Sequence, residues 1–259
     1  RSADAGQSWE VISPDLTRND PERQGPGGQP YTNEAAGGEN YNTIMYLAVS
    51  PHEKGVIWSG SDDGLVHLTR NGGESWENVT GNIPGLPRWG TIANIEVSRF
   101  NPGAAYMTVD LHQMGDFDPY VYKTEDYGQT WKLISQAVPK SVHSFAHVLK
   151  EDPKRPGMLY LGVDNGIYIT TDDGQSWMRL RNNLPPAPVY WLEIQERFDD
   201  LVVGTYGRGY YILDNIAPLR EFDVDARGEE AHLFSLRPAY RFQEQEAIKT
   251  DGPSMNSGR

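Results

Sequence analysis

The sequence predicts an all-β fold, a β-propeller built from four-stranded antiparallel blades. Three observations support this prediction. An octet that ends in tryptophan recurs four times along the 259-residue chain. Short β-branched and aromatic runs, bounded by Gly, Pro and Asp, lie between the octets and are typical of strands. The 27 Gly and 18 Pro residues exceed their usual abundance, which indicates many turns and few long helices.

Each octet reads [ST]-x-[DN]-x-G-x-[ST]-W and is termed a Trp box here. We expect the Asp or Asn to accept backbone N–H groups and close a turn, and the Gly to supply a positive φ. The Trp should begin the next strand and face inward. Acid or metal chemistry is the alternative role for these Asp residues, but four turns are more natural than four copies of a catalytic centre. The positions are Asp4, Gly6 and Trp9; Asn71, Gly73 and Trp76; Asp126, Gly128 and Trp131; and Asp172, Gly174 and Trp177.

The strands follow one another in groups of three, and a box with a fourth strand after its Trp ends each of the first three groups. Boxes recur every ~45–65 residues, which is the size of a propeller blade with variable loops. The expected strands are 43–49, 55–60 and 65–68; 91–97, 104–109 and 120–123; 145–149, 158–163 and 167–169; and 189–194, 201–205 and 210–213.

The fourth group has no box of its own, whereas the N-terminus supplies an isolated box and one strand over 9–12. Four to five blades are therefore visible. That N-terminal strand could complete the last blade of a closed four-bladed ring, or the chain could be an arc of a larger propeller. We expect the arc. The predicted organisation is a propeller over 1–215 and an outgoing segment over 216–259, with a short helix at 217–222 and then an extended tail.

Composition excludes several classes of function. The net charge of −13 and pI near 4.9 disfavour nucleic acid or an anionic membrane as the main partner. No cysteine is present, so disulfides, Cys-liganded zinc and a thiol nucleophile are excluded. No apolar run approaches ~18 residues, so we expect no membrane insertion.

The boxes resemble the Asp-box, or BNR repeat, of sialidase-like and sortilin-type β-propellers. The chain is similar to the propellers of large bacterial proteins with sortilin-N-terminal-type repeats, often labelled "glycosyl hydrolase" or WD40/YVTN/BNR-like repeat protein. The resemblance implies an extracytoplasmic protein and makes the remainder of a longer parent chain an expected partner. Besides the boxes, the resemblance to this family rests on residues 38–41, 62–66, 98–100, 116–120, 151–153, 206–214 and 253–259.

Loops between second and third strands, together with the loops between blades, should share one face of the propeller, where we expect ligands to bind. A glycosidase would need two carboxylates about 5–10 Å apart on this face. The candidate catalytic residues are Asp63, Asp116 and Asp118. The candidate ligand-binding residues are Asp62, Trp89, Asp110, His112, Asp164, Tyr206 and Arg208. The alternative, which we favour, is that the Asp residues end strands and cap turns. A sialidase would need three clustered arginines, and the loops offer only Arg88 and Arg208.

We expect no cofactor and no metal. Residues 110–118 carry oxygen ligands that suit calcium, but their spacing does not match an EF-hand, and a solvated insertion is favoured. His143 and His147 are four residues apart on an expected strand and should not share a face.

The favoured function is a non-catalytic binding or scaffold module that presents an acidic loop face to a protein or glycan partner. The alternative is a glycoside hydrolase of the sialidase or xyloglucanase type. A sortilin-type peptide receptor is less favoured, since such domains rely on disulfides.

Overall fold

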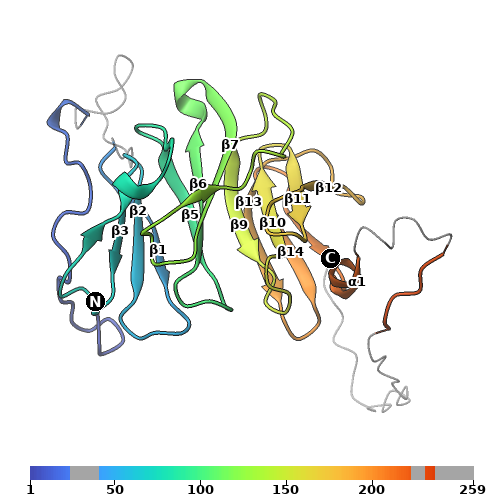
Figure 1. Cartoon of the computed structure of the whole chain (residues 1–259), viewed down its shortest axis with the longest axis horizontal. Coiled ribbons are helices and arrows are strands. Elements are labelled where there is room, and N and C mark those ends of the chain that lie inside the picture. The colour runs from blue at the N-terminus through green and yellow to red at the C-terminus, as the bar shows by residue number, and fades with distance from the viewer. Residues whose placement is uncertain (24–40, 223–230, 237–259) are drawn as a thin grey trace, which may run out of the picture.

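The computed structural model describes residues 1–23, 41–222 and 231–236, and they form four antiparallel sheets in series (Figure 1). Each sheet is a meander whose strand order follows the chain. The sheets are β1 (Ile44–Val49), β2 (Ile57–Ser61), β3 (Val66–Thr69) and β4 (Glu77–Asn78); β5 (Thr91–Val97), β6 (Ala105–Leu111), β7 (Asp116–Thr124) and β8 (Lys132–Leu133); β9 (Ala146–Glu151), β10 (Leu159–Val163), β11 (Gly166–Thr170) and β12 (Met178–Leu180); and β13 (Val189–Gln195), β14 (Asp200–Thr205) and β15 (Tyr210–Leu213). The blade prediction is confirmed, with three strands rather than four in the last sheet.

Apolar side chains between successive sheets form the core. Trp58, Ile92 and Met107 are fully buried between the first and second sheets. Tyr106 and Leu161 belong to the cluster between the second and third sheets. A third cluster joins the third sheet to the fourth. Strands buried on both faces explain why the sequence shows continuous apolar runs rather than strict alternation.

The innermost strands β1, β5, β9 and β13 face a common channel. The Lys150 ammonium lies 3.4 Å from a carboxylate oxygen of Glu96 and 3.4 Å from one of Glu193, so it links three neighbouring sheets. Across the channel, Tyr46 of β1 stacks on Trp191 of β13 with ring centroids 6.5 Å apart. The four sheets are therefore arranged around one axis.

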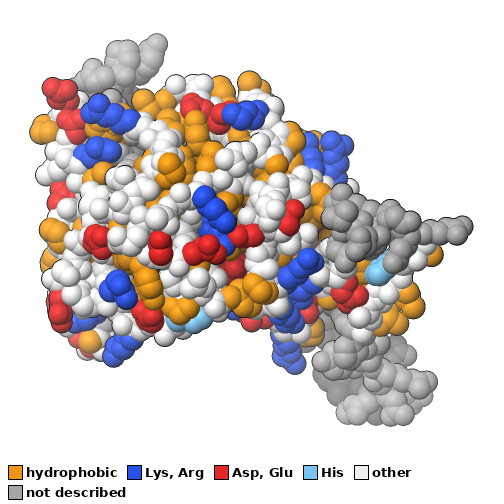
Figure 2. Space-filling model, in the orientation of Figure 1, with side chains coloured by type: hydrophobic (Ala, Val, Ile, Leu, Met, Phe, Trp, Pro, Cys, Tyr) orange, Lys and Arg blue, Asp and Glu red, His pale blue; other side chains and the backbone are white. Residues whose placement is uncertain are grey.

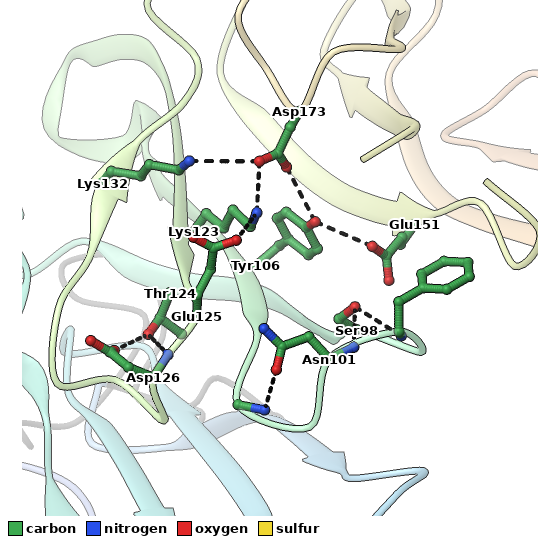
Figure 3. Close-up of polar contacts among 12 residues, drawn as sticks. Ser98, Asn101, Tyr106, Lys123, Thr124, Glu125, Asp126, Lys132, Glu151 and Asp173 are labelled. Atoms are coloured by element: carbon green, nitrogen blue, oxygen red, sulfur yellow. Dashed lines mark hydrogen bonds and ion pairs between the residues drawn. The ribbon is translucent and has the colours of Figure 1, made fainter. Parts of the chain in front are cut away.

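The Trp boxes are turns closed by side-chain hydrogen bonds. Asp172 accepts hydrogen bonds from the N–H of Ser176 at 2.9 Å, from the Ser176 hydroxyl at 2.6 Å and from the Thr170 hydroxyl at 2.7 Å. Asp126 makes the same set, of which Figure 3 shows the bond from Thr124. The glycine of each box has a positive φ, for example 84° at Gly174. These carboxylates are thus occupied by their own turns.

A polar network joins the second and third sheets on the side of the box turns (Figure 3). The buried Lys123 ammonium lies 2.6 Å from Asp173 and 2.7 Å from Glu125. The Tyr106 hydroxyl, which lies between Asp173 and Glu151, donates to one or other carboxylate at 3.3 or 3.2 Å. The network is a structural connection between blades.

Two expected elements differ in the structure. Residues 9–12 lie in no sheet. The expected insertion at 110–118 is mostly strand, because Leu111 pairs with Asp116 beyond a bulge and leaves only 112–115 as the turn, with a 3-10 helix at His112–Met114. Two other 3-10 turns lie at Pro21–Arg23 and Thr80–Asn82.

The short helix expected after the last strand is α1 (Ala217–Glu221). No helix in the described part of the chain is long and apolar enough to cross a membrane. Residues 38–40 and 253–259, which contribute to the resemblance, and most of the expected tail lie outside the described residues. The domain boundary at 215 stays a prediction.

Candidate functional site

A cavity of about 390 Å³ lies at the end of the channel where β1, β5, β9 and β13 begin. Loops and strand ends from all four sheets reach it, as expected for this face. The lining residues are Tyr41, Met45, Asp62, Trp89, Thr91, Ala93, Asp110, Leu111, His112, Gln113, Met114, His147 and Tyr190. None of these lining residues is Lys or Arg, so the charge at the cavity comes from carboxylates and from histidine.

Five stacked or tilted rings, termed the aromatic row, run along this face from the second sheet to the fourth. His112 stacks on Phe145 with centroids 4.6 Å apart, and Phe145 meets His147 edge-on at 5.0 Å. His147 stacks on Tyr190 at 4.1 Å, and Tyr190 lies 5.7 Å from Tyr206. Tyr190 is 50% exposed and Tyr206 is 73% exposed, so the last two rings offer surface to a ligand.

A carboxylate lies beside each histidine of the row, and the one beside His112 is within hydrogen-bond distance. Nδ1 of His112 lies 2.8 Å from both carboxylate oxygens of Asp110. Asp164 lies 2.8 Å from Nδ1 of His143 and 3.6 Å from Nε2 of His147. The two histidines therefore approach the same carboxylate, contrary to the expectation from their spacing, because His143 lies in the loop before β9 rather than in the strand.

Burial shifts two ionisable groups at the cavity. Burial lowers the pKa of His147, against the opposing charges of Asp110 and Asp164, and so favours the neutral imidazole. Burial and the neighbouring charge of Asp63 raise the pKa of Asp62, against a hydrogen bond from the N–H of Thr43. A raised carboxyl pKa at a cavity is a feature of binding and catalytic sites.

The structure brings most of the expected ligand-binding residues together. Four of them line the cavity: Asp62, Trp89, Asp110 and His112. Asp164 and Tyr206 join them through His147 and Tyr190. Arg208 is exposed in the β14–β15 loop and does not line the cavity.

Trp89 is not an open stacking platform. It is only 8% exposed. The guanidinium groups of Arg18 and Arg88 lie 5.1 and 5.3 Å from its ring, and Tyr41 meets it edge-on. The rings with free surface are instead Tyr190 and Tyr206.

The three candidate catalytic carboxylates are bound within the fold, and none lines the cavity. Asp63 is fully buried and accepts hydrogen bonds from the Arg18 N–H at 2.6 Å and the Ser61 hydroxyl at 2.5 Å. Asp116 accepts a 2.7 Å hydrogen bond from the Tyr120 hydroxyl. Asp118 forms an ion pair with Lys140.

Sequence reasoning missed Met45, His147 and Tyr190 as parts of the site. All three lie near the start of an innermost strand, next to the loops that were predicted to bind ligands. Their positions in the sequence could have identified them, since the first residues of an innermost strand lie at the channel mouth. In the described residues, no group of three His, Asp or Glu has an arrangement that could hold a metal ion.

Comparisons with known proteins agree with the fold. No family model matches the chain. Over 85 residues it is 35% identical to an oligoxyloglucan-reducing end-specific xyloglucanase of Emericella nidulans. Over 111 residues it is 30% identical to a vacuolar protein sorting/targeting protein 10 of Laccaria bicolor. These matches cover 31% and 42% of this chain but only 10% and 7% of the two relatives.

Solved structures are similar over two thirds of the chain. The GH74 enzyme of Niastella koreensis superimposes with a TM-score of 0.53 at 15% identity, covering 68% of this chain and 29% of that one. The GH74 xyloglucanase of Xanthomonas campestris gives 0.50 at 13% identity, covering 66% and 29%. The resemblance to BNR- and sortilin-type β-propellers is confirmed at the level of fold.

Proposed function

We propose that this chain is a non-catalytic binding module that takes a carbohydrate at the channel-mouth cavity. The aromatic row carries this proposal. The exposed rings of Tyr190 and Tyr206 provide flat apolar surface for a sugar face. The carboxylates of Asp110 and Asp164 and the imidazoles beside them provide hydrogen-bond partners for sugar hydroxyls.

The bonding of the candidate catalytic carboxylates supports a binding role. Asp63 is enclosed, Asp116 is hydrogen-bonded to Tyr120, and Asp118 is paired with Lys140. A group that moves protons must reach the substrate. Both relatives are much longer than this chain, which is consistent with a module of a larger protein. The proposal also includes an extracytoplasmic location, and it allows a protein ligand at the same face.

One observation favours the alternative, a glycoside hydrolase. Asp62 lines the cavity and has a raised pKa, as a general acid would need. In that case the acid would be Asp62 rather than one of the three carboxylates named from the sequence.

The test is a glycan array, followed by calorimetric titration of each glycan that binds. We expect Tyr190→Ala to weaken binding at least about tenfold, because one anchoring ring is lost. Phe100→Ala is the matched control, since Phe100 is 40% exposed in the β5–β6 turn at the opposite ends of the strands. Equal binding by both variants, or no glycan bound, would contradict the proposal. Turnover of a chromogenic glycoside that is lost in Asp62→Asn would establish the hydrolase instead.

A further inference from the structure

The channel-mouth cavity combines negative charge with exposed aromatic surface. Asp62 and Asp110 line it, and its lining contains neither Lys nor Arg. Over the face of the molecule that Figure 2 shows, by contrast, acidic and basic side chains are interspersed. The charge of the cavity is therefore a local property, and it bears on which ligand the cavity takes.

Thr91 brings the two lining carboxylates to one wall of the cavity. Its hydroxyl donates a 3.2 Å hydrogen bond to the main-chain oxygen of Asp62, and its backbone lies opposite Asp110 in the pairing of β5 with β6. The loop between β2 and β3 and the end of β6 therefore meet at this residue. An ionised carboxylate only accepts hydrogen bonds, so this wall calls for a ligand that donates them.

Asp62 has no counter-ion within the described part of the chain, where none of the ion pairs includes it. Its carboxylate accepts a 2.9 Å hydrogen bond from the N–H of Thr43. Burial and the charge of Asp63 raise its pKa in spite of that bond. A cation bound beside Asp62 would offset both effects, because an opposite charge favours the ionised carboxylate.

The negative charge extends to the exposed end of the aromatic row. Burial, and then the charges of Asp110 and Asp164, raise the pKa of Tyr190, whose ring is 50% exposed. The face of an aromatic ring also attracts cations. The surface on which we place a sugar ring is therefore one where a positive charge is favoured.

His147 gives an independent indication of a ligand. Its imidazole lines the cavity and is only 6% exposed, and its Nε2 has no hydrogen-bond partner among the described residues. The Asp164 carboxylate, at 3.6 Å, is beyond hydrogen-bond distance. A buried polar atom without a partner costs free energy, and such an atom is typical of a site that a bound group completes.

Two arginines lie near the cavity but do not neutralise it. The guanidinium groups of Arg18 and Arg88 lie 5.1 and 5.3 Å from the ring of Trp89, and neither residue lines the cavity. Nε of Arg18 donates a 2.8 Å hydrogen bond to the main-chain oxygen of Asp63. These cations belong to the packing around Trp89, and the carboxylates on the cavity wall keep their charge.

We propose that the carbohydrate taken by this cavity is a cationic amino sugar, whose free ammonium groups bind at Asp62 and Asp110. The inference rests on the proposed function, which supplies the sugar ring on Tyr190 and Tyr206. An ammonium group is a donor only and carries the charge that this wall lacks. An N-acetylated sugar has lost that charge, and a uronic or sialic acid carries a carboxylate that the cavity repels.

The test is calorimetric titration with oligosaccharides of glucosamine, N-acetylglucosamine, glucose and glucuronic acid, matched in length and linkage. At a pH just below neutral, where the amines are protonated, the glucosamine series should bind at least about tenfold more tightly than the two neutral series, because hydrogen bonds between charged groups are the stronger ones. The glucuronic acid series should not bind. Added salt should reduce the preference for glucosamine, since it screens the charges.

Asp62→Asn keeps an acceptor for the N–H of Thr43 but removes the charge. It should bring the affinity for glucosamine close to that for N-acetylglucosamine. Asp214→Asn, at an exposed residue after β15 that does not line the cavity, is the matched control and should keep the full preference. The comparison among the four series uses the unmodified chain, so it does not depend on how well either variant folds.

Each outcome separates this inference from the proposed function. Equal binding of the charged and neutral series, or tighter binding of glucuronic acid, would overturn the amino-sugar inference and leave a carbohydrate site in place. A preference for glucosamine that Asp62→Asn retains in full would overturn it too. Absence of binding by every glycan would contradict the proposed function as well.

Discussion

The indole nitrogen of Trp177 and the main-chain oxygen of Ile134 are joined by a 2.9 Å hydrogen bond that connects one blade to the previous one. Trp131 instead donates to Gly128 within its own box, at 3.2 Å. A box tryptophan therefore either bonds to the neighbouring blade or closes its own turn, and the rings of Trp131 and Trp177 are both buried between sheets.

Replacing Trp177 should destabilise the chain strongly. The ring is only 9% exposed, and Trp177→Ala would remove its packing together with the bond to Ile134. We expect a loss of about 3–5 kcal/mol in the free energy of unfolding, measured by urea denaturation. Val142→Ala, at a position that is 60% exposed, should change it by less than about 0.5 kcal/mol. Similar losses for the two variants would contradict the burial of the box tryptophan.

Asp172→Asn should keep the turn but reduce its acid sensitivity. Burial raises the pKa of Asp172, but hydrogen bonds from Ser176 and Thr170 outweigh it and leave the pKa below its usual value. The bonded carboxylate thus stabilises the fold above the unfolded pKa of about 3.9, and this stability is lost as pH falls through the folded pKa. In the second box the amide oxygen of Asn71 accepts the equivalent hydrogen bonds from Thr69 and Ser75, so we expect Asn to be tolerated at this box position. The melting temperatures of Asp172→Asn and the unmodified chain at pH 7 should agree within a few degrees. Below about pH 4 the melting temperature of the variant should fall less than that of the unmodified chain.

The buried Glu96 should make the chain less stable as pH rises towards neutrality. Burial raises the pKa of Glu96 to about 7, against the charge of Lys150. The folded state then holds a proton that the unfolded state has released, so stability falls between pH 4.5 and about 7. Glu96→Gln keeps an acceptor for the N–H of Glu151 and does not titrate. Denaturation midpoints should decline across this window in the unmodified chain and decline less in the variant; parallel curves would contradict the assignment.

Lys123→Met tests the network between the second and third sheets. The methionine fills the buried stem position but removes the ammonium that lies against Asp173 and Glu125. We expect a loss of about 1–3 kcal/mol, because Asp173 keeps only its contacts to Lys132 and Tyr106. Lys54→Met, on an exposed turn, is the matched control and should have little effect. Unchanged stability in Lys123→Met would contradict a structural role for the network.

Much of the fold could be predicted because its signals are local. The turn residues of the boxes and the β-branched and aromatic segments between them predict where strands begin and end. The strands Thr91–Val97 and Tyr210–Leu213, for example, have the predicted bounds. The strand expected over 9–12 is not formed, because strand structure there needs a neighbouring sheet that the described residues do not supply. The edge of β7 was missed because Asp116 and Asp118 are poor strand formers, yet their backbone pairs across a bulge with β6.

The candidate site was predicted only as a set of loops. Sequence spacing placed Asp62, Asp110 and His112 on one face, and the cavity contains all three. The sequence did not show that Asp63 points into the fold, since adjacent carboxylates differ only in side-chain direction. Stacking of His147 on Tyr190 joins two blades, so no local pattern signals it.

The packing of box glycines on the preceding blade is the contact on which the blade arrangement depends. Gly174 and Gly207 both have positive φ, at 84° and 76°, so alanine is strained at either position. A Cβ at Gly174 would lie 2.8 Å from Ile134, whereas one at Gly207 would meet nothing within 4 Å. The most direct test is the free energy of unfolding of Gly174→Ala against Gly207→Ala. We predict that Gly174→Ala costs about 1–3 kcal/mol more, and equal costs would contradict the stacked-blade account.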